Sequence, residues 1–257
     1  MTIAPITLNG EALQLADRTG VDRATAQCGA VTLIQRFGGA LSDSVIAPAD
    51  NGNGANAFKD FNEYYVWILD NRSRALQGLG RWDDAVTQLR KASRRPENGA
   101  INVSQALNLG ALYADLDRPD EALAAVSDLG TVSPYGRMQL EQVRLMASIK
   151  REDELAVDTH LAFMREHRAD AIGTYQRALL AANRMDAAAT FLIELLRSEV
   201  WRGRALTAMQ EYAGVPMAPS TMVTNARWHA VIARPGVQSE LTKVGRIEQI
   251  NLAPPSD

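Results

Sequence analysis

A short segment recurs four times along the chain at a nearly constant spacing. Each copy places an arginine shortly before one to three acidic residues. The arginines are Arg81, Arg118, Arg151 and Arg184, so successive copies lie 37, 33 and 33 residues apart. Self-similarity at a period of 20 to 50 residues is typical of repeat architectures, in which each unit is one supersecondary element. The chain is therefore expected to fold as an array of similar units.

Each segment is predicted to be a turn between two helices. Gly80, Asp117 and Asn183 tolerate the left-handed conformation that ends a helix, and Lys150 is the exception in the third copy. The acidic residues then fall in the first turn of the next helix, where they face free backbone N–H groups. Pro119 suits the first helical position, which needs no N–H. Apolar residues follow at helical spacing in every copy. They are Ala85, Val86, Leu89 and Ala92; Ala122, Leu123, Val126 and Leu129; Leu155, Ala156, Ala162 and Phe163; and Ala188, Leu192, Leu195 and Leu196.

These residues resemble the tetratricopeptide repeat (TPR) family over roughly residues 58–203. The second copy carries the resemblance best, with Leu109-Gly110, Tyr113, Ala122 and Pro134 at the family's packing positions. The other copies depart from it: Ser73 and Gln176 replace the small glycine, and Leu155 stands where alanine is usual. The resemblance implies an all-α fold, a right-handed superhelix of about four helical hairpins. It also implies that the first helix of each hairpin lines a concave groove that holds peptides.

Three regions are predicted. Residues 1–57 form an N-terminal extension and linker, which ends in the Asn- and Gly-rich run 51–56. Residues 58–203 form the repeats. Residues 204–257 form C-terminal capping helices, expected at 221–233 and 238–244, and a tail, because an array needs terminal elements that cover its last apolar face. Residues 246–252 alternate apolar and polar, which fits a short strand or an extended tail.

The segment 28–41 resembles part of some insertion-sequence transposases. In that family it leads into a His-x-His metal motif, but here no histidine occurs before His160. The alternative function is therefore a transposase-derived or nucleic-acid-associated protein without catalytic residues. A net charge of -3 and a pI near 5.7 count against nucleic acid as the partner.

Composition and motifs exclude several classes of protein. The single cysteine, Cys28, rules out a disulfide framework and a thiolate-rich zinc site. His160 and His167 are expected to be ordinary surface or half-buried side chains, and no catalytic motif is present, so we expect no enzymatic activity, no cofactor and no small-molecule substrate. No uninterrupted apolar stretch is long enough for a bilayer, and the start does not read as a signal peptide. A cytoplasmic protein is expected, or a periplasmic one if a natural signal peptide is missing.

The expected partner is a protein or peptide bound in the groove. The predicted peptide-binding residues are Trp67, Arg74, Asn108, Arg137, Arg144 and Arg177. Arg74, Arg144 and Arg177 are predicted at one equivalent position of three first helices, which would form a basic row suited to an acidic segment or a chain terminus. The competing interpretation is that these arginines are solvated and pair with neighbouring acids. Those acids are Asp70, Glu141 and Asp170.

Overall fold

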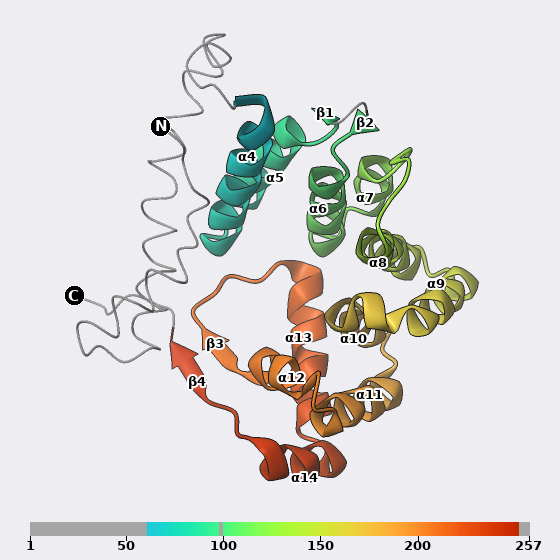
Figure 1. Cartoon of the computed structure of the whole chain (residues 1–257), viewed down its shortest axis with the longest axis vertical. Helices are drawn as coiled ribbons and strands as arrows, with labels where there is room; N and C mark the ends of the chain where they lie inside the picture. Colours follow the sequence, from blue (N-terminus) through green and yellow to red (C-terminus); the bar gives the residue numbers. More distant parts are fainter. Residues whose placement is uncertain (1–60, 98–99, 252–257) are drawn as a thin grey trace, which may run out of the picture. The chain divides into compact units, whose positions relative to one another are not determined.

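The computed structural model describes residues 61–97 and 100–251, and this part of the chain is all-α, as predicted (Figure 1). Its helices are α4 (Phe61–Gly78), α5 (Trp82–Ala92), α6 (Val103–Asp115), α7 (Pro119–Ala125), α8 (Pro134–Lys150), α9 (Glu154–Glu166), the 3₁₀ turn η1 (Arg168–Asp170), α10 (Ile172–Ala181), α11 (Met185–Arg197), α12 (Arg202–Met209), α13 (Pro219–Ile232) and α14 (Pro235–Val244). The predicted helices at 221–233 and 238–244 are confirmed as α13 and α14. The predictions for residues 1–57, including Cys28 and the segment 28–41, lie outside the described residues.

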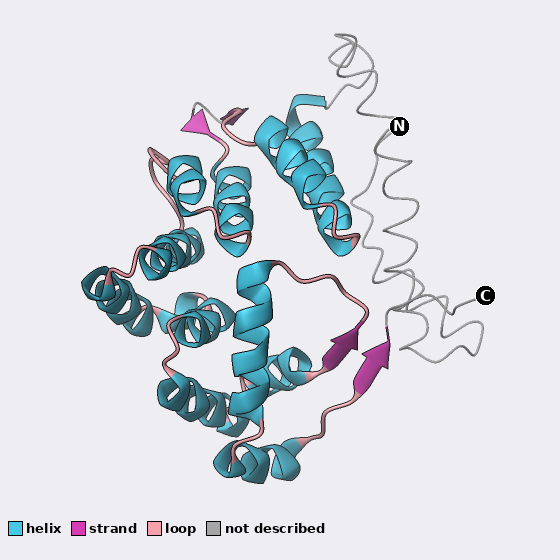
Figure 2. Cartoon of the chain, turned by 180° about the vertical axis from the view of Figure 1, so that it is seen from behind, coloured by secondary structure: helices cyan, strands magenta, loops and turns pink. Residues whose placement is uncertain are grey.

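Two pairs of short strands accompany the helices. β1 (Pro96–Glu97) pairs antiparallel with β2 (Ala100–Ile101). β3 (Glu211–Ala213) pairs parallel with β4 (Gln249–Asn251) (Figure 2). In this pair Tyr212 lies opposite Ile250. The alternating segment 246–252 therefore does contain a strand.

The described chain divides into two compact units. The first comprises residues 61–85, 210–216 and 248–251, and the second comprises residues 86–209 and 217–247. In the first unit, α4 buries Tyr65, Leu69 and Leu76, and β3 and β4 form their parallel pair.

The second unit contains three helical hairpins in sequence order. α6 packs against α7, α8 against α9, and α10 against α11. α8 also packs against α6, α7 and α10, so neighbouring hairpins share their apolar faces. Met138, Leu145, Met164, Leu192 and Leu196 are fully buried in this unit. This packing between neighbouring hairpins buries side chains that an isolated hairpin would leave exposed.

Four turns of similar backbone geometry join successive helices. Gly80, Asp117, Glu152 and Asn183 have φ values of 71°, 60°, 57° and 57°. In each turn the next residue donates its backbone N–H to the carbonyl five residues back, the helix-ending Schellman pattern. The four bonds are Arg81 to Leu76 at 2.9 Å, Arg118 to Tyr113 at 2.9 Å, Asp153 to Ser148 at 3.0 Å and Arg184 to Leu179 at 2.8 Å.

The third turn lies two residues later than the sequence pattern predicts. Lys150 is still helical, and Glu152 takes the left-handed position. The reason is Asp153, whose side chain accepts the N–H of Ala156 at 3.0 Å and so starts α9 at Glu154. The prediction that Leu155 lies on the buried face is therefore wrong, because Leu155 is 81% exposed.

With this shift the second helices bury equivalent positions in all four copies. These are the fifth, ninth and twelfth residues after the left-handed one. They are Ala85, Leu89 and Ala92; Ala122, Val126 and Leu129; Val157, Leu161 and Met164; and Ala188, Leu192 and Leu195, all at most 9% exposed.

In α4, α6 and α10 the close-packing position of the first helix is filled in two different ways. Gly110 lies so near α7 that an added Cβ would meet Val126 and the carbonyl oxygen of Ala122. In α4 and α10 a polar side chain instead donates to the corresponding carbonyl. Ser73 bonds to Ala85 O at 2.9 Å and Gln176 to Ala188 O at 3.1 Å. A side chain replaces glycine here by contributing a hydrogen bond.

The C-terminal helices do more than cover the last hairpin. α12 and α14 pack against α11, but α13 contacts α10, α11 and also α6. Ser220 donates to the carboxylate of Asp117, which Lys150 also contacts at 2.8 Å. Arg227 donates to the carbonyl oxygens of Leu180 at 2.8 Å and Ala181 at 2.6 Å, the free acceptors at the end of α10. α13 thus binds the ends of two earlier first helices.

None of the helices described is both long and apolar enough for a transmembrane span.

Candidate functional site

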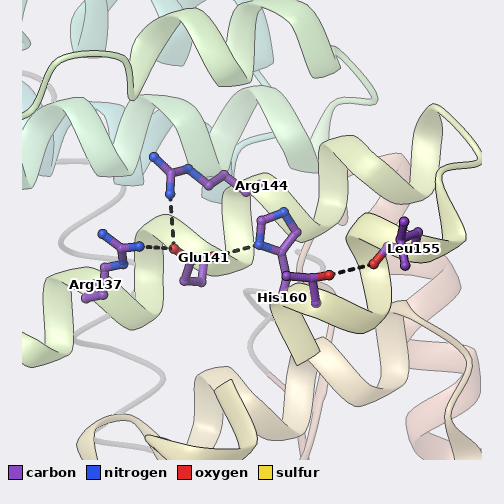
Figure 3. Close-up of polar contacts among 6 residues, drawn as sticks. Arg137, Glu141, Arg144, Leu155 and His160 are labelled. Atoms are coloured by element: carbon purple, nitrogen blue, oxygen red, sulfur yellow. Dashed lines mark hydrogen bonds and ion pairs between the residues drawn. The ribbon is translucent and has the colours of Figure 1, made fainter. Parts of the chain in front are cut away.

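A buried carboxylate in the second unit gathers three basic side chains. Glu141 on α8 is 4% exposed. Its Oε1 accepts from Arg137 at 2.9 Å and from Arg144 at 3.1 Å, and its Oε2 accepts from Nδ1 of His160 at 2.6 Å (Figure 3). We call Arg137, Glu141, Arg144 and His160 the Glu141 cluster. It brings together two of the predicted peptide-binding residues, Arg137 and Arg144.

Local helix geometry explains the cluster. Arg137 and Arg144 lie four residues before and three residues after Glu141, spacings that place side chains on one helix surface. α8 begins at Pro134, where the Ser133 hydroxyl accepts the N–H of Gly136 at 3.0 Å. His160 comes from α9, the partner helix of the same hairpin, and is half-buried.

The cluster keeps Glu141 ionised. Burial alone would raise the pKa of this carboxyl, but the His160 hydrogen bond and the charges of His160, Arg137 and Arg144 outweigh burial and hold the pKa below 4.5. Two guanidinium groups then face one carboxylate, which leaves at least one net positive charge. The side chains of Arg137 and Arg144 are 45% and 38% exposed, so part of that charge reaches solvent.

A hollow adjoins one end of the cluster. Its volume is about 280 Å³, and Arg137 lines it together with Val132, Pro134, Phe163, His167 and Asp170. The Arg137 guanidinium lies 5.3 Å from the centre of the Phe163 ring, and Phe163 stacks on His167 with 4.3 Å between ring centroids. Arg137 is therefore positioned by Glu141 on one side and by an aromatic ring on the other.

The remaining predicted site residues lie elsewhere. Arg74, in the first unit, pairs with the buried carboxylate of Asp70 at 3.4 Å. Arg177 on α10 pairs with Asp115 on α6, so its expected pairing with Asp170 is wrong. Asp170 instead lies 3.7 Å from Nδ1 of His167. Trp67, in the first unit, is 42% exposed, and Asn108 on α6 is half-buried.

The predicted equivalence of Arg74, Arg144 and Arg177 is wrong for Arg144. Counted from the left-handed turn residues, Arg74 and Arg177 both lie six residues before the turn, whereas Met146 has that position in α8. Arg144 is two residues earlier, which turns it by about 200° around the helix. The basic surface of α8 is formed by Arg137 and Arg144 of the Glu141 cluster. In the sequence, only the spacing of these two arginines from Glu141 indicated this surface.

His160 is the cluster residue that sequence reasoning missed. It comes nineteen residues after Glu141, and no local spacing links the two. Within residues 61–97 and 100–251, no group of three or more His, Cys, Asp or Glu side chains is arranged to hold a metal ion. The site presents two part-exposed guanidinium groups, Arg137 and Arg144, held by one buried carboxylate.

Comparisons with protein-family models, with curated proteins and with solved structures each returned no match.

Proposed function

We propose that this protein is a helical-repeat scaffold, similar to TPR proteins, that binds an acidic polypeptide segment. The observation that carries the proposal is the Glu141 cluster, where one buried carboxylate holds two part-exposed arginines at 2.9 and 3.1 Å. An arginine held in this way loses little conformational entropy when it binds a carboxylate, which favours charge-assisted hydrogen bonds. The hollow beside Arg137 would accept an apolar side chain next to the acidic one.

The recurrent turn supports the architecture in this proposal. The same hydrogen bond closes all four turns, and the same three positions are buried after each one. Regular repetition of this kind is what a superhelical array of hairpins requires. The concave groove of that array would carry the polypeptide.

The proposal is tested by selection of peptides from a random display library on the full chain. The selected peptides should be enriched in Asp and Glu, and their affinities can then be measured by fluorescence anisotropy. The double variant Arg137→Gln/Arg144→Gln should weaken binding at least tenfold, because each charge-assisted bond contributes about 1.5–3 kcal/mol.

The matched control is Arg165→Gln on α9, an exposed arginine outside the Glu141 cluster. It removes a positive charge without touching Glu141 and should leave peptide affinity unchanged. Circular dichroism confirms that each variant is folded. Binding by the folded double variant at parental affinity, or selection of no peptide below about 100 µM, would contradict the proposal.

A further inference from the structure

The hollow beside the Glu141 cluster carries opposite charges on its walls. Arg137 lines it from α8, and Asp170 lines it from η1, the turn between α9 and α10. The side chains of Arg137 and Asp170 are 45% and 37% exposed, so a ligand can reach both charged groups from solvent. A ligand that matches these walls offers an anionic group at one end and a cationic group at the other.

Aromatic surface separates the two charges. The Arg137 guanidinium lies 5.3 Å from the centre of the Phe163 ring, and that ring stacks on His167. Nδ1 of His167 in turn lies 3.7 Å from the carboxylate of Asp170. The four side chains therefore follow one another along the hollow in the order Arg137, Phe163, His167 and Asp170. An apolar group of a ligand would lie between its two charged groups.

Both charged ends keep hydrogen-bonding capacity for a ligand. Arg137 and Arg144 approach the same carboxylate oxygen of Glu141 (Figure 3), so this end carries net positive charge. A guanidinium group has several N–H donors in a planar fork, so the ion pair with Glu141 leaves others of Arg137 for an anion. At the other end, the 3.7 Å contact between His167 and Asp170 is longer than a hydrogen bond. Asp170 can therefore accept hydrogen bonds from a cationic group.

We propose that the polypeptide segment bound here carries an acidic, an apolar and a basic residue in a fixed order, an inference that rests on the proposed function. The acidic side chain would contact Arg137, the apolar one would pack on Phe163, and the basic one would pair with Asp170. In an extended segment, residues two apart point to the same side and lie about 6.6 Å apart. The three residues are therefore expected at alternate positions, with the apolar residue in the middle.

The test measures binding of labelled peptides to the full chain by fluorescence anisotropy. All peptides have capped ends and the same Gly- and Ser-rich flanks. Two mixed-charge peptides contain Glu-Ser-Leu-Ser-Lys and its reverse, Lys-Ser-Leu-Ser-Glu, because a segment can run in either direction. The double-acid peptide contains Glu-Ser-Leu-Ser-Glu, and a fourth peptide has serine in place of leucine.

The tighter of the two mixed-charge peptides should bind about threefold or more tightly than the double-acid peptide, because Asp170 attracts its lysine and repels a second glutamate. It should exceed the peptide without leucine by a similar factor. Equal binding of the mixed-charge and double-acid peptides would overturn this inference and leave the proposed function standing. Absence of binding by every peptide below about 1 mM would overturn both.

A charge reversal at Asp170 assigns the preference to this residue. Asp170→Lys should make the double-acid peptide the tighter ligand, and Asp170→Asn should remove the preference for either peptide. Glu194→Lys is the matched control, because it makes the same charge change at an exposed position of α11 outside the hollow, and it should keep the parental preference. Circular dichroism confirms that each variant is folded. The parental preference in folded Asp170→Lys or Asp170→Asn would overturn the inference.

Discussion

Gly110 and Val126 approach so closely that a Cβ built on the glycine would lie 2.5 Å from Cγ1 of the valine. The same Cβ would lie 3.2 Å from the carbonyl oxygen of Ala122 and 3.4 Å from Cγ1 of Val143 on the next hairpin. One position thus sets the distance between α6 and α7 and also adjoins α8.

Replacement of Gly110 should therefore strain the array. Gly110→Ala gains helix propensity, but the methyl group overpacks the contact with Val126, and the free energy of unfolding should fall by about 1–3 kcal/mol. Gly173→Ala on α10 is the control, because its Cβ enters open space, and it should raise stability by up to about 1 kcal/mol. Urea unfolding followed by circular dichroism measures both. Equal effects of the two substitutions would contradict the packing described.

The position of the third turn gives a second prediction. Glu152 has a φ of 57°, so Glu152→Gly should be neutral or should raise the free energy of unfolding by up to about 1 kcal/mol. Lys150→Gly should lower it by about 1 kcal/mol or more, because Lys150 ends α8 and contacts Asp117. Thermal and urea unfolding of the two variants and of the parent measure these differences in stability. If Lys150→Gly were more stable than Glu152→Gly, the turn would lie at Lys150, as the sequence pattern predicted.

The buried face of α9 gives a third prediction. Leu155→Ala should change stability by no more than about 0.5 kcal/mol, since this side chain is 81% exposed. Val157→Ala should lower stability by about 1–3 kcal/mol, because Val157 is 3% exposed and leaves a cavity. The comparison uses urea unfolding at pH 7. If Leu155→Ala lowered the free energy of unfolding more than Val157→Ala did, the assignment of the buried face of α9 would be contradicted.

The Glu141 cluster predicts a dependence of stability on pH. The pKa of Glu141 is depressed in the folded protein, so its ionisation stabilises the fold fully above about pH 4.5, and this contribution is lost as pH falls through the folded pKa. Glu141→Gln should cost about 1–3 kcal/mol at pH 7. It should also flatten the loss of stability in acid.

The measurement is urea unfolding of the parent and Glu141→Gln at several pH values between 3 and 7. The difference in stability between them should shrink as pH falls below about 4.5. Glu248→Gln serves as a control for the removal of one surface carboxylate. Parallel curves for the parent and Glu141→Gln over the whole range would show that the carboxylate is not held as described.

The sequence predicted the helical hairpins because their signals are local. Pro119, the acidic first turns and the apolar spacing of α5, α7 and α11 act within a few residues, and these helices lie where expected. The position of the third turn was predicted wrongly because Arg151 aligns with the other arginines in the sequence. In the structure, the N-cap residue Asp153 determines where α9 begins. The start of α9 is therefore set by the Asp153 cap and not by the alignment of Arg151 with the other arginines.

Long-range contacts account for what sequence reasoning missed at the candidate sites. Arg137, Glu141 and Arg144 were identified from one helix, but His160 reaches Glu141 only when α9 folds against α8. Arg177 was expected to pair with Asp170 nearby, yet it meets Asp115, 62 residues away.

The attachment of α13 determines when the second unit can be completed. Ser220 bonds to Asp117 across 103 residues, and Arg227 occupies the carbonyl oxygens at the end of α10. An array in which each hairpin contacts only its neighbours could fold one hairpin at a time as the chain leaves the ribosome. Here the ends of α6 and α10 must wait for a helix synthesised well after them, so a nascent chain halted after α11 would expose unfinished polar ends to chaperones and proteases.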